Sequence, residues 1–186
     1  MMSLEELSLW IGGVYIALHI PLLAAPKKIR TLMKAFPRNF SAGVVLTGIA
    51  LVWSAYEVYD MPLGALIEGY KWLLWGLTPA IYLLIVAFMN ELLAPRALGG
   101  LLLLVANPVL SIQRLYSTRL TAVIAVLAYV WIVIGITLVL SPYRFRKVGV
   151  ERWGSTDVRC RWAGAIGVAL GVVLVALGLT VFKGAT

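Results

Sequence analysis

The sequence predicts an all-α integral membrane protein, a single transmembrane domain over residues 1–186 with about six transmembrane helices. Hydrophobic residues make up 62% of the chain, charged residues only 13%, and the mean hydropathy is +0.96. An average soluble domain carries about a quarter of its residues as charges, and a soluble protein of this length has too little interior to bury so much apolar surface. The apolar residues also form long runs, which is typical of membrane spans.

Six apolar runs are long enough for transmembrane helices, each of which needs about 20 residues. The first run follows two acidic residues, Glu5 and Glu6, instead of the basic head of a signal peptide, and we therefore interpret it as a true span. The fourth run is short and is interrupted by Asn107 and Pro108. The predicted spans cover residues 7–25, 40–56, 72–90, 97–113, 121–141 and 162–182.

The distribution of positive charge predicts the orientation of these spans. With six spans, the connections at 26–39, 91–96 and 142–161 share one side of the membrane, and they hold most of the 16 lysine and arginine residues. The positive-inside rule makes this side cytoplasmic and places both termini on the non-cytoplasmic side, in a bacterial or archaeal cytoplasmic membrane. If the fourth run did not cross, the two most basic connections would face opposite sides. The net charge of +8 therefore records orientation and does not indicate a nucleic-acid partner.

Related tracts close the first, third and fifth spans and predict three helical hairpins. Each tract places a proline before a cation, at Pro26, Pro95 and Pro142, and such a sequence ends a helix and suits an anionic leaflet. We expect the hairpins to turn on the cytoplasmic side. The basic residues there are expected to bind phospholipid headgroups, with contacts from Lys27, Lys28, Arg30, Arg144, Arg146 and Lys147.

His19 is the candidate cofactor-binding residue. It is the only histidine, it lies inside the first span, and it precedes Pro21, whose missing N–H frees the carbonyl of Ala17. A histidine in this position could ligate haem or chlorophyll or hydrogen-bond a quinone. The alternative is a neutral histidine that packs against a neighbouring helix. A haem held by two histidines of this chain is excluded, and the single Cys160 offers no metal site.

Small residues on the last span predict close helix packing. Gly167 and Gly171 are four residues apart, which is the spacing of a close-packing motif in membrane helices. The pattern does not identify the helix that they contact. The predicted helix-packing residues are Gly164, Gly167, Gly171 and Gly178.

The spans lack the groups that most catalytic or ion-coupled membrane proteins use. No Asp, Glu, Lys or Arg lies in the middle of a predicted span, and the chain carries no recognisable catalytic motif. We therefore expect a protein without enzymatic activity. It would be an integral subunit that packs within a larger membrane complex and helps to assemble or stabilise that complex. Respiratory and photosynthetic complexes are the candidates. Its partners would be other membrane subunits and phospholipids. The alternative is a small uncoupled transporter or channel, with a path lined by helices that Pro21, Pro79 and Pro108 interrupt.

Overall fold

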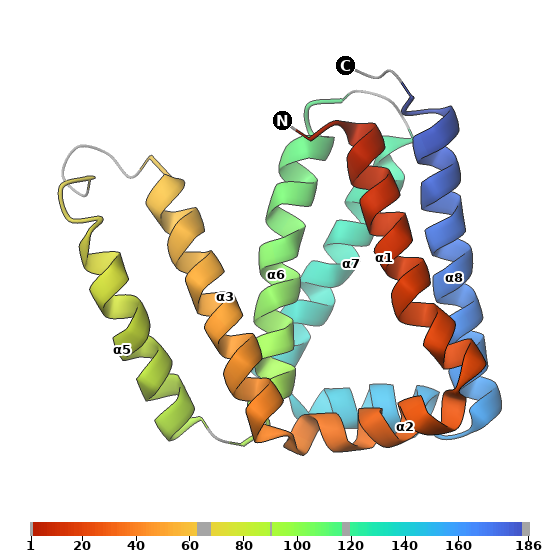
Figure 1. Ribbon diagram of the computed structural model, residues 1–186, viewed down its shortest axis with the longest axis horizontal. Helices are drawn as coiled ribbons and strands as arrows, with labels where there is room; N and C mark the ends of the chain where they lie inside the picture. Colours follow the sequence, from red (N-terminus) through yellow and green to blue (C-terminus); the bar gives the residue numbers. More distant parts are fainter. Residues whose placement is uncertain (1, 63–67, 90, 117–119, 184–186) are drawn as a thin grey trace.

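The computed structural model describes residues 2–62, 68–89, 91–116 and 120–183, and within these ranges the chain is largely helical and contains no strand. Five of the described helices are long and apolar enough to cross a membrane. The fold is therefore that of an all-helical, multi-pass membrane protein (Figure 1). The five long helices are α1 (Leu4–Ala24), α3 (Phe40–Asp60), α6 (Leu93–Gln113), α7 (Thr121–Leu140) and α8 (Asp157–Thr180).

The third predicted span, residues 72–90, forms a shorter helix than the others. Helix α5 (Leu73–Phe88) has 16 residues, which at about 1.5 Å per residue gives roughly 24 Å. The hydrocarbon core of a bilayer is about 30 Å thick. Residue 90 lies outside the described residues. The third predicted span, and the six-span topology that depends on it, therefore stay a prediction.

The fourth run, which Asn107 and Pro108 interrupt in the sequence, forms one of the long helices. Helix α6 has 21 residues, begins at Leu93, ahead of the predicted start at residue 97, and continues through Pro108. The earlier start is possible because Pro95 lies in the first turn, where backbone N–H groups have no helical partner in any case. The tract around Pro95 therefore begins the fourth span and does not close the third.

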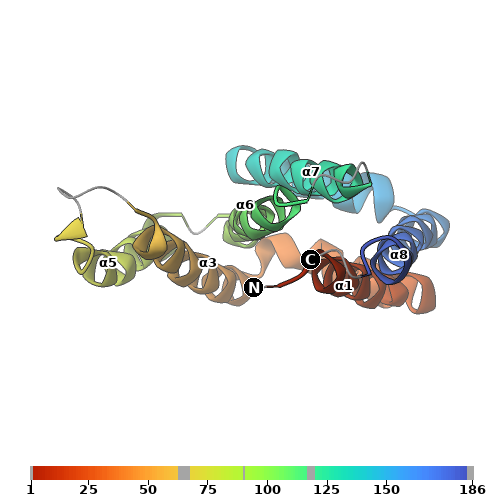
Figure 2. The ribbon, with the colours of Figure 1, turned by 90° about the horizontal axis from the view of Figure 1, so that it is seen from above.

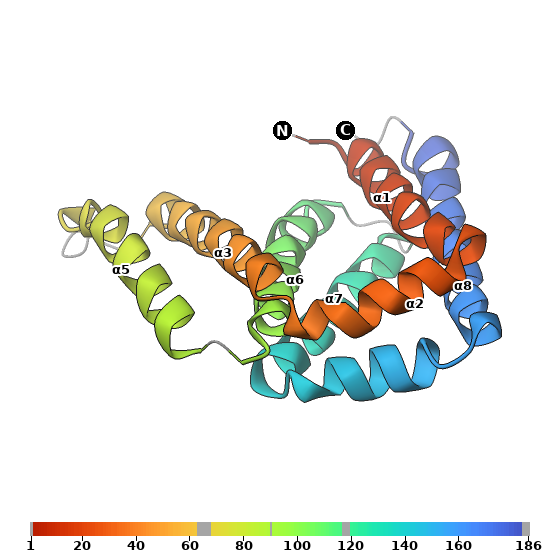
Figure 3. The ribbon, with the colours of Figure 1, turned by 60° about the horizontal axis from the view of Figure 1, so that its bottom comes forward.

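Two basic connections are themselves helical and lie across one end of the long helices (Figures 1 and 3). Helix α2 (Pro26–Ala35) separates its polar and apolar residues onto opposite faces, and the short 3₁₀ helix η1 (Phe36–Arg38) joins it to α3. The π-helical segment η2 (Phe145–Trp153) lies between α7 and α8. A basic amphipathic helix such as α2 is typical of a membrane–water interface.

The long helices pair differently from the predicted hairpins. Helix α1 packs along α8, α6 packs along α7, and α3 contacts α6 and, less extensively, α5. Among the described residues, α1 with α3, α5 with α6, and α7 with α8 make few or no contacts. The prediction of three hairpins is therefore wrong. In two of the three cases the cause is visible: α2, about 15 Å long, and η2 carry the chain sideways, whereas a helical hairpin needs a short connection.

The start of α1 and the end of α8 lie at one end of the molecule, which we call the terminal end, and α2 and η2 lie at the other, the basic end (Figure 1). A buried cluster joins the α1–α8 pair to the α6–α7 pair near the terminal end, and towards the basic end the two pairs diverge (Figure 1). Helices α3 and α5 extend to one side as an arm (Figure 2). The buried cluster comprises Leu4, Leu7, Ile11, Ala106, Val109, Ile124, Ala128, Trp131, Leu174 and Phe182.

Candidate functional site

The four glycines predicted for helix packing are all buried on the face of α8 that contacts α1. A Cβ atom added at Gly164 would lie 2.9 Å from the Cβ of Leu22, and one added at Gly178 would lie 3.2 Å from Cδ2 of Leu9. Helix α1 is thus the neighbour that the sequence pattern left unidentified. The close approach increases van der Waals contact, which drives helix association in lipid.

The backbones of the two helices meet at Gly12 and Gly171. A Cβ atom at Gly12 would lie 2.7 Å from the carbonyl oxygen of Gly171, and one at Gly171 would lie 2.8 Å from the carbonyl oxygen of Gly12. Ordinary Cβ contacts are 3.4–4 Å long. Neither position therefore accepts a side chain unless the helices move apart.

His19 lies in the same interface. A face of its imidazole ring covers Gly167, where an added Cβ atom would be 2.0 Å from Cδ2 and 2.2 Å from Cγ of the ring. The ring also stacks with Tyr15, with 5.2 Å between the ring centroids and 14° between the planes. Only glycine at position 167 leaves room for this placement of the imidazole.

The hydrogen bond of His19 identifies which ring nitrogen is free. Nδ1 lies 2.8 Å from the carbonyl oxygen of Tyr15, and because a carbonyl oxygen only accepts, Nδ1 carries the proton of the neutral ring. Nε2 then has the available lone pair, but an added Cβ at Gly167 would be 2.5 Å from it, so the α8 backbone runs beside this atom. These contacts support the packing interpretation of His19, and cofactor binding stays a prediction.

Tyr15 connects the α1–α8 interface to α7. Trp131 Nε1 donates a hydrogen bond to Tyr15 Oη at 2.8 Å, and the two rings stack with 6.1 Å between their centroids. A second polar contact, from Ser8 Oγ to the carbonyl oxygen of Leu174 at 2.7 Å, is buried between α1 and α8. Polar groups within a membrane need such partners because lipid offers none.

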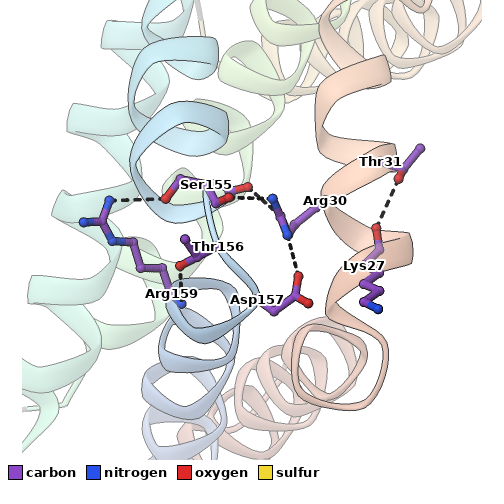
Figure 4. Close-up of polar contacts among 8 residues, drawn as sticks. Lys27, Arg30, Thr31, Ser155, Thr156, Asp157 and Arg159 are labelled. Atoms are coloured by element: carbon purple, nitrogen blue, oxygen red, sulfur yellow. Dashed lines mark hydrogen bonds and ion pairs between the residues drawn. The ribbon is translucent and has the colours of Figure 1, made fainter.

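Arg30 attaches α2 to the beginning of α8, as Figure 4 shows. Its Nε donates to the carbonyl oxygen of Gly154 at 2.8 Å, and its two terminal nitrogens donate to the carbonyl oxygen of Ser155 and to Oδ1 of Asp157. The guanidinium group suits this position because it offers several donors in one plane. Arg30 was predicted to bind lipid headgroups, but all three of its nitrogens are engaged by the protein.

The other predicted headgroup contacts lie at the basic end with exposed side chains. Lys27 and Lys28 are on α2, and Arg144, Arg146 and Lys147 are in and beside η2. Arg146 Nε pairs with Oε1 of Glu151 at 3.4 Å, and both side chains are exposed. An exposed pair of this kind contributes little to stability, so these cations can still approach anionic headgroups. Lipid binding by this group stays a prediction.

A polar contact between α3 and α6 was missed by the sequence reasoning. Helix α3 continues to Asp60, so Glu57, which follows the predicted span 40–56, lies in its last turn. One Glu57 carboxylate oxygen accepts from Trp53 Nε1 and the other from Asn107 Nδ2, each at 3.0 Å. The contact links the two helices through Asn107, a residue read in the sequence only as a helix interruption. The available signal was the four-residue separation of Trp53 and Glu57, which places both on one helix face.

The described part of the chain contains no group of three or more histidine, cysteine, aspartate or glutamate side chains that could hold a metal ion. Cys160 is free and buried. No protein-family model matches the chain, and no curated protein or solved structure matches it either.

Proposed function

We propose that the chain is a non-catalytic integral subunit of a larger membrane complex, in which it packs against other membrane subunits and helps to hold them together. The observation that carries this proposal is the arm formed by α3 and α5 (Figure 2). None of the residues 73–88 of α5 is buried, and the main contacts of this helix are with α3. Helix α5 therefore presents most of its surface to its surroundings.

The two contacts of α3 differ in closeness. Towards α6, a Cβ atom at Gly43 would lie 2.9 Å from the backbone nitrogen of Ala94. Towards α5, a Cβ atom at Gly48 would lie 3.6 Å from Cε2 of Tyr82, an ordinary van der Waals distance. In lipid, helices associate through close packing and polar contacts. The α3–α6 contact thus fixes the arm to the α6–α7 pair. Helix α5 lacks such close packing, and a neighbouring subunit would supply it.

The surface of the arm is hollowed between its two helices. A hollow of about 340 Å³ lies there, and its lining is almost entirely apolar. Glycine and proline in its walls leave room for side chains from a neighbouring transmembrane helix. The lining residues are Gly48, Leu51, Val52, Trp75, Thr78, Pro79 and Tyr82.

Native mass measurement after gentle solubilisation tests this proposal. We expect the chain, extracted from its own membrane in a mild detergent, to migrate with other membrane proteins at a mass well above 20.3 kDa. A chain that runs alone, or only with copies of itself, under conditions that keep known membrane complexes intact would contradict the proposal.

A pair of glycine substitutions tests whether the arm is the attachment surface. Gly76→Leu places a bulky side chain on α5, and Gly100→Leu places the same side chain on α6; an added Cβ meets no described atom within 4 Å at either position. Both variants should therefore fold. We expect Gly76→Leu to reduce the amount of co-migrating protein and Gly100→Leu to leave it unchanged. Equal effects of the two variants would show that the arm has no special part in attachment.

A small uncoupled transporter or channel is the second candidate function. It is favoured by the arrangement of α1–α8 and α6–α7, which meet near the terminal end and diverge towards the basic end (Figure 1), and by Pro21 and Pro108 inside α1 and α6. Proline interruptions at corresponding places in two halves are typical of transporter binding sites. Liposomes containing the purified chain should then swell faster in glycerol than protein-free liposomes. Equal swelling rates would reject this candidate for a solute of that size.

A further inference from the structure

Helices α1 and α6 carry the same arrangement of glycines and proline. Each has two adjacent glycines and, at the same spacing, a proline further along the helix. In each helix the first glycine is buried against a partner helix, and an added Cβ at the second would meet no described atom within 4 Å. The matching residues are Gly12, Gly13 and Pro21 in α1, and Gly99, Gly100 and Pro108 in α6.

The partner helices α8 and α7 meet these glycines in the same way. An added Cβ would lie 2.7 Å from the partner's carbonyl oxygen at Gly12 and at Gly99, and 2.8 Å from it at Gly171 and at Gly135. Both crossings therefore bring two helix backbones together through a reciprocal pair of glycines. A valine one turn beyond the glycine of α8 or α7 completes each contact, Val175 in α8 and Val139 in α7.

The buried faces of α7 and α8 share one register. Five buried residues of α7 correspond to five buried residues of α8, and the same number of residues separates the two members of each matched pair. A helix packed on one neighbour buries every third or fourth residue in any case, so it is the matching position of the glycine within the series that is informative. The matched buried residues are Ile124 and Cys160, Ala128 and Gly164, Trp131 and Gly167, Gly135 and Gly171, and Leu138 and Leu174.

The two pairs run in opposite directions. Helix α1 runs from the terminal end to the basic end, and its counterpart α6 runs from the basic end to the terminal end; α8 and α7 are opposed in the same way (Figure 1). Units related like this are inverted-topology repeats, which in transporters rock against each other. The present arrangement of the units is not symmetric, because the buried cluster joins them near the terminal end and they diverge towards the basic end.

We propose that α1–α8 and α6–α7 are inverted copies of one helix pair that rock between the observed arrangement, closed at the terminal end, and a second arrangement closed at the basic end. Each glycine crossing keeps its own pair together, so a pair moves as a unit. An inverted repeat exchanges the two ends, and the contacts that now close one end therefore have counterparts that would close the other.

The side chains of the two helix pairs also indicate which class of solute could pass between them. Charged residues in these four helices lie only near the helix starts, at Glu5, Glu6, Arg96, Asp157, Arg159 and Arg161. The remaining length suits an uncharged solute, because a charge would lose its hydration there. This solute class rests on the second candidate function. The motion does not, since a subunit of a complex could rock in the same way.

The register assigns residues that should meet in the second arrangement. Ile11 of α1 and Ile124 of α7 belong to the cluster that closes the terminal end. Their counterparts are Leu98 of α6 and Cys160 of α8. In the observed arrangement Leu98 lines a hollow of about 420 Å³ beside α2, α3 and η2, and Cys160 is buried near the start of α8. The second arrangement would bring both residues into the region that closes the basic end.

A single substitution tests the motion because Cys160 is the only native cysteine. Leu98→Cys in the full chain, reconstituted in liposomes, is treated with a short bismaleimide, and linked peptides are quantified by proteolysis and mass spectrometry. The control is Gly100→Cys, at nearly the same depth on the opposite face of α6, where an added Cβ meets no described atom within 4 Å. A minor state populated at about 0.1–10% is trapped irreversibly by such a reagent, so we expect Leu98→Cys to link to Cys160 at least about tenfold faster than the control.

Equal linking rates for the two variants would overturn the proposal. Should Leu98→Cys fail to fold, Leu102→Cys, one turn along the same face of α6, takes its place with a longer linker and the same expected outcome. The measurement uses the isolated chain and detects intramolecular links. Its result is therefore independent of whether the chain migrates with other subunits or conducts glycerol.

Discussion

Replacing Gly167 by alanine tests whether His19 is a packing residue of the α1–α8 interface. The new Cβ atom would lie 2.0 Å from Cδ2 of the imidazole, and the three nearest atoms all belong to His19. The helices need not separate, because the imidazole can rotate away about its own side-chain bonds. The cost of the substitution is therefore the cost of displacing this ring.

The contacts of His19 set the magnitude. Displacing the ring breaks the hydrogen bond between Nδ1 and the carbonyl oxygen of Tyr15, worth about 0.5–1.5 kcal/mol, and the stacking on the Tyr15 ring, worth about 0.5–1.5 kcal/mol. Gly167→Ala should thus lower the free energy of unfolding by roughly 1–3 kcal/mol. His19→Ala removes the same two contacts and should cost a similar amount.

A double-mutant cycle in mixed micelles measures this coupling, with unfolding by increasing SDS followed by tryptophan fluorescence. In the His19→Ala background, Gly167→Ala should cost less than about 0.5 kcal/mol, because the ring that it displaces is absent. Equal costs of Gly167→Ala in both backgrounds would refute the packing role. A haem or chlorophyll absorption band in the purified protein that disappears in His19→Ala would establish the cofactor role instead.

Three further predictions concern the helix crossing and the basic end. In Gly171→Ala the added Cβ meets backbone atoms of α1 that cannot rotate away. The substitution should therefore lower the free energy of unfolding by about 1–3 kcal/mol in the same assay. The control Gly13→Ala meets no described atom within 4 Å and should leave the free energy of unfolding unchanged. Arg30→Lys loses the planar set of donors to α8 and should cost about 1–2 kcal/mol, and a thermal melt that matches the native chain would contradict this contact. Lys27→Gln combined with Lys147→Gln should weaken retention of phosphatidylglycerol in native mass spectrometry without lowering the melting temperature, and unchanged lipid retention would assign headgroup binding to other residues.

The long apolar helices could be predicted from sequence because hydropathy along a run is a local property. Residues 121–141 illustrate this: they contain no charged residue and form α7 over Thr121–Leu140. The helical form of the basic connections was missed because hydropathy reports on the membrane core and not on its surface. Helix α2 does carry a signal, an apolar face that includes Ile29, Leu32 and Met33 among its cations, but that face becomes informative only when the segment is considered as an interfacial helix.

The pairing of the helices could not be predicted in the same way, because each contact depends on two segments far apart in the chain. The glycines of α8 predicted a close helix contact but did not identify the partner helix. In lipid, any helix with small residues on one face is a possible neighbour. The partner is defined by Gly12 and by the imidazole of His19, which fills the space that Gly167 leaves. Likewise, Asn107 was read as an interruption of the fourth run, although its amide side chain reaches Glu57 on another helix.

The two candidate functions differ in which junction of the molecule they use. The glycine crossings make α1–α8 and α6–α7 the closely packed parts, so movement belongs to the junctions around them. A subunit uses the junction between α3 and α5, where a partner would fix the open arm, whereas a transporter uses the junction between the two pairs, where the contacts are concentrated near one end. A bound partner should therefore slow hydrogen exchange in α5 most strongly. Rocking between the pairs should instead appear as measurable hydrogen exchange of backbone amides in the first turns of α6 and the last turns of α1, which lie at the basic end. This exchange should persist when a partner is bound to the arm.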